Sequence, residues 1–197
     1  MDLTTLKTPQ ITKLSKEHAE QVFGIQNFLS AIPDGALRSY QVHLVQWLDD
    51  VLPNDGVGVD PGLKLGVAYT VDRNHGYTLR TYIDRSALSV SEMLDVFYNV
   101  PLLVENFVPY STPVVVEGAA HNAKYGQPLL GEIRGALILG FGKGGFQFTS
   151  EVQPLSIRKK VFGAGNVQPM DFWKAAGFIK ADKDSSDALS MAICAGM

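Results

Sequence analysis

The spacing of hydrophobic positions changes near residue 54, which divides the chain into two parts. In residues 15–52 the apolar positions recur every three or four residues, a period typical of amphipathic helices. Ser15 suits the N-cap of a first helix, and the Pro and Gly within residues 32–35 would end it. A second helix is then expected, with an apolar stripe formed by Leu37, Tyr40, Leu44, Trp47, Leu48 and Val51. We expect this stripe to pack on the rest of the protein or on a partner subunit.

From residue 57 the pattern becomes that of β-strands. Short apolar runs at 57–60, 65–70 and 77–83 are separated by turn residues, which predicts an antiparallel meander. The turn-rich stretch at 53–56 marks a boundary. The sequence therefore predicts an N-terminal helical extension over residues 1–53 and a main domain over residues 54–197.

The rest of the chain alternates between helical and strand patterns. Helices are expected at about 90–107, 127–140, 154–161, 168–178 and 185–195, and strands at 114–117 and 146–152. A helix between two strands normally makes them parallel neighbours through a right-handed crossover. The predicted fold class is therefore α/β, a mixed five-stranded sheet flanked by helices.

Composition is that of a globular protein. Hydrophobic residues make up 46% of the 197 positions, enough for a packed core. The longest apolar stretches are shorter than the roughly 20 residues that cross a bilayer, so no membrane span is expected. The N-terminal residues have neither a secretory nor an Arg-rich targeting pattern, which favours a cytoplasmic location and leaves a mitochondrial one open. The single cysteine excludes an internal disulfide.

Charge is distributed unevenly along the chain. Residues 121–180 hold eight Lys and Arg against three Asp and Glu, whereas the whole chain has a net charge of −3. This asymmetry allows a basic face that binds nucleic acid, although solvated surface lysines would give the same count.

Two carboxylates end predicted strands. Asp60 closes the run 57–60 and Glu117 closes the run 114–117. If these strands are parallel neighbours, their carboxyl ends lie about 4.8 Å apart, and both side chains enter the crevice where α/β sheets place their sites. The alternatives are that Asp60 begins a turn and that Glu117 ends a strand at the surface.

A further pair of carboxylates, Asp184 and Asp187, begins the last predicted helix. Residues three apart share a helix face, although the same pair would also suit a helix N-terminus through its dipole. Four carboxylates in one crevice repel one another unless cations neutralise them, and oxygen ligands favour Mg²⁺ or Mn²⁺ over zinc. We therefore expect a pair of divalent ions, an arrangement suited to phosphodiester hydrolysis.

Four segments in order resemble the motifs of one family, the RuvC-type Holliday junction resolvases. VGVDPGLKLGVAYT resembles the first motif, VVVEGAAHNAKYGQPLLGEIRGALIL the second, PLSIRKKVFGAGN the basic segment and KDSSDALSMAICAG the C-terminal acidic motif. The resemblance runs from Val57 to the end of the chain. It implies a ribonuclease H-like fold and a homodimer that makes paired nicks in a four-way DNA junction.

The resemblance also assigns residues. Asp60, Glu117, Asp184 and Asp187 would be the catalytic carboxylates and would hold two Mg²⁺ or Mn²⁺ ions per active site. DNA-binding candidates are Arg158, Lys159, Lys160, Lys124, Lys174, His121 and Tyr125. Bacterial members have an aromatic wedge where this chain has Ala120, so the wedge is either absent or supplied by a neighbour such as His121 or Tyr125. Lys174 would substitute for a basic residue at the position of Pro169.

Two features concern assembly and origin. In relatives the helix after the second motif, here 126–140, builds the dimer. The first 50 or so residues have no counterpart in the bacterial enzymes, which suggests a phage or other mobile-element protein acting in the cytoplasm of its host. Open alternatives are a ribonuclease H-fold nuclease for another branched or hybrid nucleic acid, and a junction-binding module that does not cleave.

Overall fold

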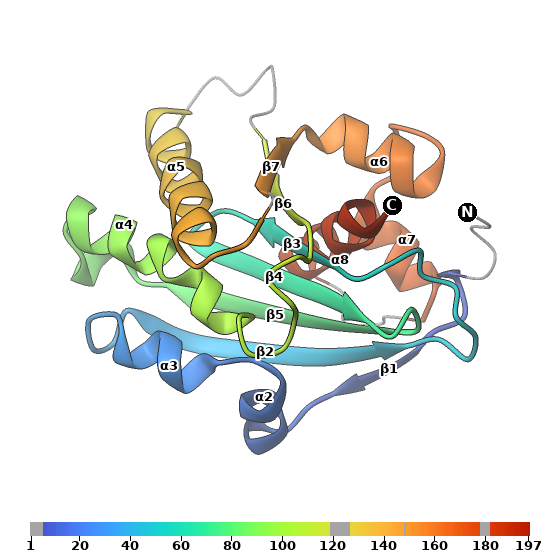
Figure 1. The fold of residues 1–197 in the computed structure, drawn as a ribbon, viewed down its shortest axis with the longest axis horizontal. Helices are drawn as coiled ribbons and strands as arrows, with labels where there is room; N and C mark the ends of the chain where they lie inside the picture. The colour runs from blue at the N-terminus through green and yellow to red at the C-terminus, as the bar shows by residue number, and fades with distance from the viewer. Residues whose placement is uncertain (1–5, 119–126, 148, 178–181) are drawn as a thin grey trace.

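The protein is built around one seven-stranded sheet. The computed structural model describes residues 6–118, 127–147, 149–177 and 182–197 (Figure 1). The sheet order is β1-β2-β5-β4-β3-β6-β7. The strands are β1 (Gln10–Lys13), β2 (Leu37–Gln46), β3 (Gly56–Asp60), β4 (Lys64–Val71), β5 (His75–Ile83), β6 (Val114–Glu117) and β7 (Thr149–Val152). The pairs β1–β2, β2–β5, β5–β4 and β4–β3 are antiparallel, whereas β3–β6 and β6–β7 are parallel.

Helices cover both faces of the sheet (Figure 1). One layer contains α2 (Lys16–Val22), α3 (Ile25–Ser30), α4 (Val90–Tyr98) and α5 (Gln127–Lys143), with the short 3₁₀ turns η1 (Arg85–Ala87) and η2 (Val100–Leu103). The other contains α6 (Pro154–Phe162), α7 (Pro169–Ala175) and α8 (Lys183–Gly196). The central strand β3 is buried at every position, as expected for a strand covered on both faces. No helix in the described ranges is long and apolar enough to cross a membrane.

Glycines in β3 and β4 let α8 lie directly on the sheet. A side chain at Gly58 would overlap the carbonyl oxygen of Ala188, and one at Gly66 would overlap that of Asp184. Because these positions carry no Cβ, the helix backbone approaches the strands more closely than ordinary side chains allow. This close approach brings the start of α8 down to the end of β3.

The α/β fold class is confirmed, but the sheet has seven strands instead of five. The predicted helix after residue 36 is wrong: residues 37–46 form β2, which pairs with β5 along its length. Val42 packs into the core beneath α4 and α5, whereas Val45 packs into the core beneath α8. A strand buried on both faces has apolar residues on both sides, and here their spacing imitated that of a helix.

Trp47 and Leu48 illustrate the same error. Trp47 is 1% exposed and its ring lies 6.2 Å from that of Trp173, whereas Leu48 is 81% exposed. Neighbouring residues point to opposite sides in extended chain, so the expected stripe does not exist. Trp47 does pack, as expected, but from the end of a strand. In the described part of the N-terminal segment, α2 and α3 are helical, whereas β1 and β2 belong to the sheet.

The remaining elements follow the sequence closely. The three strands of the meander and the strand at 114–117 are confirmed. The helix expected at 90–107 ends at Tyr98, and η2 follows, since Pro101 cannot donate the next backbone hydrogen bond. Helix α5 does not end at Gly140 but continues to Lys143. The glycine at position 140 lets the helix lie close to the backbone of Tyr98 and does not end the helix.

Substituting Gly58 by alanine is expected to lower the free energy of unfolding by about 1–3 kcal/mol, because the new methyl group must push α8 off the sheet. Chemical denaturation measures this change. Gly142→Ala is the matched control: it lies in α5 with open space around it, so the substitution should leave stability unchanged or raise it by up to about 1 kcal/mol. Equal effects of the two substitutions would contradict the close approach of α8.

Candidate active site

Two carboxylates meet at one edge of the sheet. Asp60 ends β3 and Glu117 ends β6, and these parallel strands are in register with Val59 opposite Val116. The side chain of Asp60 is only 7% exposed. Burial raises the pKa of Asp60 well above its usual value, and the negative charge of Glu117 raises it further. A positive charge at this edge of the sheet would therefore be stabilised.

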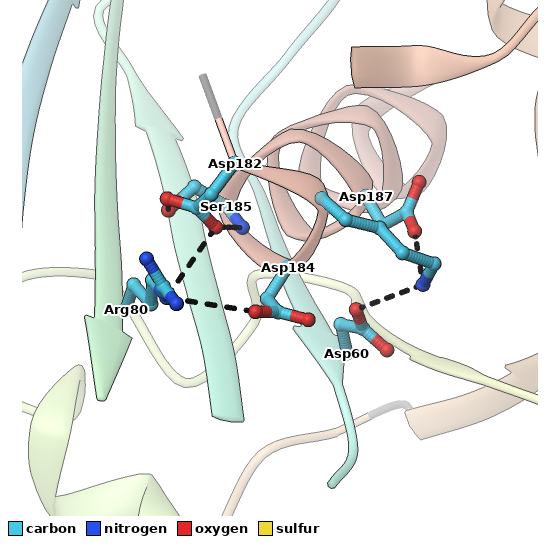
Figure 2. Close-up of polar contacts among 7 residues, drawn as sticks. Asp60, Arg80, Asp182, Asp184, Ser185 and Asp187 are labelled. Carbon is cyan, nitrogen blue, oxygen red and sulfur yellow. Dashed lines mark hydrogen bonds and ion pairs between the residues drawn. The ribbon is translucent and has the colours of Figure 1, made fainter. Parts of the chain in front are cut away.

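Helix α8 contributes a second buried carboxylate beside Asp60. Its N-cap is Asp182, whose side chain accepts a hydrogen bond from the backbone N–H of Ser185 at 2.9 Å. One turn further on, Asp187 is 5% exposed and lies on the side of α8 that faces Asp60 (Figure 2). The capped helix start thus holds Asp187 above the end of β3.

Lys183 joins the helix to the strand. Its Nζ lies 2.7 Å from Oδ2 of Asp187 and 3.7 Å from Oδ2 of Asp60 (Figure 2). Burial alone would lower the pKa of Lys183, but the charges of Asp60 and Asp187 outweigh burial and raise it. At 2.7 Å the ammonium and the Asp187 carboxylate are in direct contact, so the attraction of opposite charges holds the pair.

Asp184 faces a different cation. Its Oδ2 lies 3.6 Å from Nε of Arg80, which is also 3.8 Å from Asp182 (Figure 2). Burial and the charge of Asp182 raise the pKa of Asp184, while Lys183 and Arg80 act in the opposite direction. Asp184 and Asp187 are thus each paired with a different basic side chain, and a shared role for them stays a prediction.

A hollow beside the carboxylates contains one predicted DNA-binding residue. Its lining residues are Glu117, Pro154, Ile157, Arg158, Pro169, Asp187, Ser190 and Met191. Arg158 comes from α6 and lines this hollow together with Glu117 and Asp187. A permanent positive charge next to acidic groups is the combination required to hold a phosphate near them.

The other predicted DNA-binding residues that the structure describes do not line this hollow. Lys160 donates a hydrogen bond from Nζ to the carbonyl oxygen of Cys194 at 2.8 Å, which fastens α6 to the last turn of α8. Lys159 is exposed on α6 and Lys174 is exposed in the last turn of α7. Lys124, His121 and Tyr125 lie outside the described residues. The DNA-binding roles of all these side chains stay predictions.

Three residues of the site were missed by sequence reasoning. Lys183 precedes Asp187 by four positions, a spacing that favours an ion pair and was available as a signal. Arg80 gave no signal, because its proximity to α8 depends on the order of the strands. Arg134 of α5 donates from Nε to the backbone carbonyl of Glu117 at 3.0 Å and lies 3.6 Å from Glu151. It therefore fixes the end of β6, where Glu117 stands.

Whether this site suits a divalent ion depends on Lys183. Within the described residues, no three His, Cys, Asp or Glu side chains already converge as a metal site. Asp60, Glu117 and Asp187 nevertheless supply the oxygen donors that Mg²⁺ and Mn²⁺ prefer, at a place that attracts positive charge. The Lys183 side chain is 64% exposed and can move into solvent. The donors fit a divalent ion once Lys183 moves away.

The architecture matches solved structures of one kind. The structure of Thermus thermophilus RuvC superimposes with a TM-score of 0.53 at 17% sequence identity, covering 71% of this chain and 91% of that one. T. thermophilus RuvC in complex with a Holliday junction substrate gives a TM-score of 0.52 at 15% identity, covering 71% and 90%. This chain therefore has the RuvC-like, ribonuclease H-like fold. A scan against protein-family models finds no match, and a search of the curated proteins finds no similar sequence.

In metal-free buffer, Asp60→Asn is expected to stabilise the protein at neutral pH by on the order of 1 kcal/mol, because it removes a buried charge that Glu117 repels. The folded protein holds the Asp60 proton more tightly than the unfolded chain does. The stabilising contribution of Asp60 is therefore complete below about pH 4 and disappears as pH rises through the raised pKa. The gain from the substitution should accordingly shrink as pH falls towards 4.

Thermal unfolding in EDTA across this pH range measures the difference between Asp60→Asn and the wild type. Asp49→Asn changes an exposed aspartate and serves as the control. A stability gain that does not depend on pH, or an equal gain in the control, would contradict a raised pKa of Asp60.

Proposed function

We propose that this protein is a metal-dependent endonuclease that resolves four-way DNA junctions by phosphodiester hydrolysis. The observation that carries this proposal is that the buried carboxylates Asp60 and Asp187, joined through Lys183, lie beside Glu117 and Arg158 at the carboxyl edge of the sheet. The RuvC-like fold supports it, since one solved structure with this fold is bound to a Holliday junction substrate. Origin from a phage or mobile element and a cytoplasmic location stay predictions from the sequence.

Asp60, Glu117 and Asp187 would hold Mg²⁺ or Mn²⁺, two ions per active site, with Asp184 joining them if it leaves Arg80. Such ions, when bound, lower the pKa of a water nucleophile and stabilise the leaving oxygen. Arg134 keeps the backbone of Glu117 in place through its carbonyl oxygen. The carboxylates would therefore bind the ions, whereas Arg134 would act as a positioning residue for Glu117.

Arg158 has the task of holding the DNA. A cluster of carboxylates repels a phosphate, so a nuclease of this type needs a fixed cation next to the cluster. Arg158 lines the hollow with Glu117 and Asp187, and a guanidinium can donate two hydrogen bonds to phosphate oxygens. Apolar Ile157 and Met191 line the same hollow and limit the access of bulk water to it.

Selectivity for a junction would come from a homodimer. A methyl group added at Gly131 or Gly135 of α5 would have no described atom within 4 Å. Leu139, on the same helix face, is 67% exposed. This unpartnered face is proposed as the dimer contact, in line with the helix expected from the sequence. Two active sites related by a two-fold axis would then cut symmetrically placed strands.

A second candidate is a junction-binding protein that does not cleave. The pairing of Asp60 and Asp187 with Lys183, and of Asp184 with Arg80, favours this alternative if the ion pairs persist in the presence of divalent ions. A nuclease for another branched or hybrid substrate is the third possibility, and the choice of DNA in the assay separates it.

With a labelled four-way junction and Mg²⁺, the protein should make paired symmetric nicks near the branch point. EDTA, Asp60→Asn and Glu117→Gln should each reduce cutting by at least about 100-fold while junction binding persists, because the carboxylates act on the ions and not on DNA affinity. Denaturing gels measure cutting and mobility shift measures binding.

Linear duplex, a three-way junction and an RNA–DNA hybrid serve as comparison substrates. Binding without any cutting by the wild type would favour the non-cleaving alternative. Preference for the hybrid would favour the third possibility, and undiminished cutting by Asp60→Asn would refute the site.

Arg158→Ala should weaken junction binding and reduce the slope of log K against log salt by about one, since it removes a phosphate contact. Lys160→Ala is the matched control on the same helix: its ammonium binds the Cys194 carbonyl, so the slope should not change, although stability falls. Fluorescence anisotropy at several salt concentrations measures both. An unaltered slope in Arg158→Ala would mean that this guanidinium touches no phosphate.

A further inference from the structure

Lys183 is placed where a metal ion would be needed. Among the described residues, it is the one whose ammonium forms ion pairs with both Asp60 and Asp187. The carboxylates are 7% and 6% exposed, while the Lys183 side chain is 64% exposed. The charged end of the lysine thus enters a buried site while most of its side chain remains in water.

Within the described residues, the contacts that hold this side chain in place are its ion pairs with Asp60 and Asp187. Lys183 is the first residue of α8, and the helix start is capped by Asp182, which bonds to Ser185 and not to Lys183. An exposed lysine gains little from an ion pair in water, but here its partners are carboxylates removed from solvent. Lys183 therefore stabilises two charges that would otherwise be buried without compensation.

A divalent ion and the ammonium cannot share this position. Both would lie within a few ångströms of the same carboxylate oxygens, where their mutual repulsion is strong. The divalent ion has twice the charge, whereas the lysine has the advantage of being tethered, which gives it a high effective concentration. Because the lysine is largely exposed, its retreat into solvent requires no rearrangement of the helix.

We propose that Lys183 is a built-in competitor of the divalent ion: it holds Asp60 and Asp187 in the metal-free protein and leaves when the ion binds. This inference rests on the proposed function, because it takes metal binding by these carboxylates as given. Lys183 thereby sets the ion concentration at which the site fills. It also keeps the acidic cluster assembled before the ion arrives.

The test is a Mn²⁺ titration by calorimetry, without DNA, on four proteins: the wild type, Lys183→Met, Lys183→Arg and Lys64→Met. Lys183→Met removes the charge and keeps the length, and should lower the dissociation constant for Mn²⁺ by roughly fivefold or more. Lys183→Arg keeps the charge and should stay near the wild type. Lys64 is exposed and its charge acts on Asp184, so Lys64→Met controls for long-range electrostatics.

Thermal unfolding provides a second measurement. In EDTA, Lys183→Met should unfold at a lower temperature than the wild type, because two buried carboxylates lose their cation. Saturating Mn²⁺ should remove this difference, since the ion then occupies the place of the ammonium in both proteins. A deficit that persists in Mn²⁺ would indicate a merely structural lysine and overturn the inference.

The outcomes separate this inference from the proposed function. If the wild type and Lys183→Met bind Mn²⁺ equally, Lys183 does not compete, while the metal site stands. An equal gain in Lys64→Met would attribute the effect to general electrostatics and would also overturn the inference. If none of the proteins binds Mn²⁺, the proposed metal site fails, and the inference fails with it.

Discussion

The accumulation of negative charge at a buried sheet edge is the constraint on which the structure depends. Asp60, Glu117 and Asp187 come from three separate parts of the chain and are brought together although they repel one another. Folding alone would avoid such a cluster, since each carboxylate loses hydration and gains a like charge as a neighbour. Lys183 reduces this cost for Asp60 and Asp187 in the metal-free protein. A site that is unfavourable for stability and is nevertheless assembled in this way is typical of function.

The backbone is arranged to make that cluster possible. Parallel pairing of β3 with β6 places Asp60 beside Glu117, and the glycines of β3 and β4 let α8 approach until Asp187 reaches them. Arg134 extends the arrangement to the other helical layer, because it reaches from α5 to the carbonyl of Glu117. The position of each acidic group is therefore determined by tertiary packing, which is more rigid than a loop.

Sequence patterns were sufficient for the centre of the fold and for the placement of Asp60 and Glu117 at neighbouring strand ends. The β-branched run that ends at Glu117 and the strand that ends at Asp60 are local signals, and their parallel pairing follows from the helix between them. The segment at 37–46 was misread because a strand covered on both faces has no fixed apolar period. Arg80 was invisible for another reason: its partner Asp184 lies about 100 positions later in the chain, and only the strand order brings them together. Long-range contacts of this kind leave no trace in local spacing.

The two N-terminal strands have a consequence for how the protein tolerates truncation. Strand β2 covers the full hydrogen-bonding edge of β5, and β1, only four residues long and ending in Lys13, covers part of β2. A short, charged outer strand is a common protection against unwanted sheet-to-sheet association. A fragment that began after residue 53 would expose the nine residues of β5 as a bare edge. Such a fragment would tend to polymerise or aggregate, so solubility, and not only packing, depends on the first part of the chain.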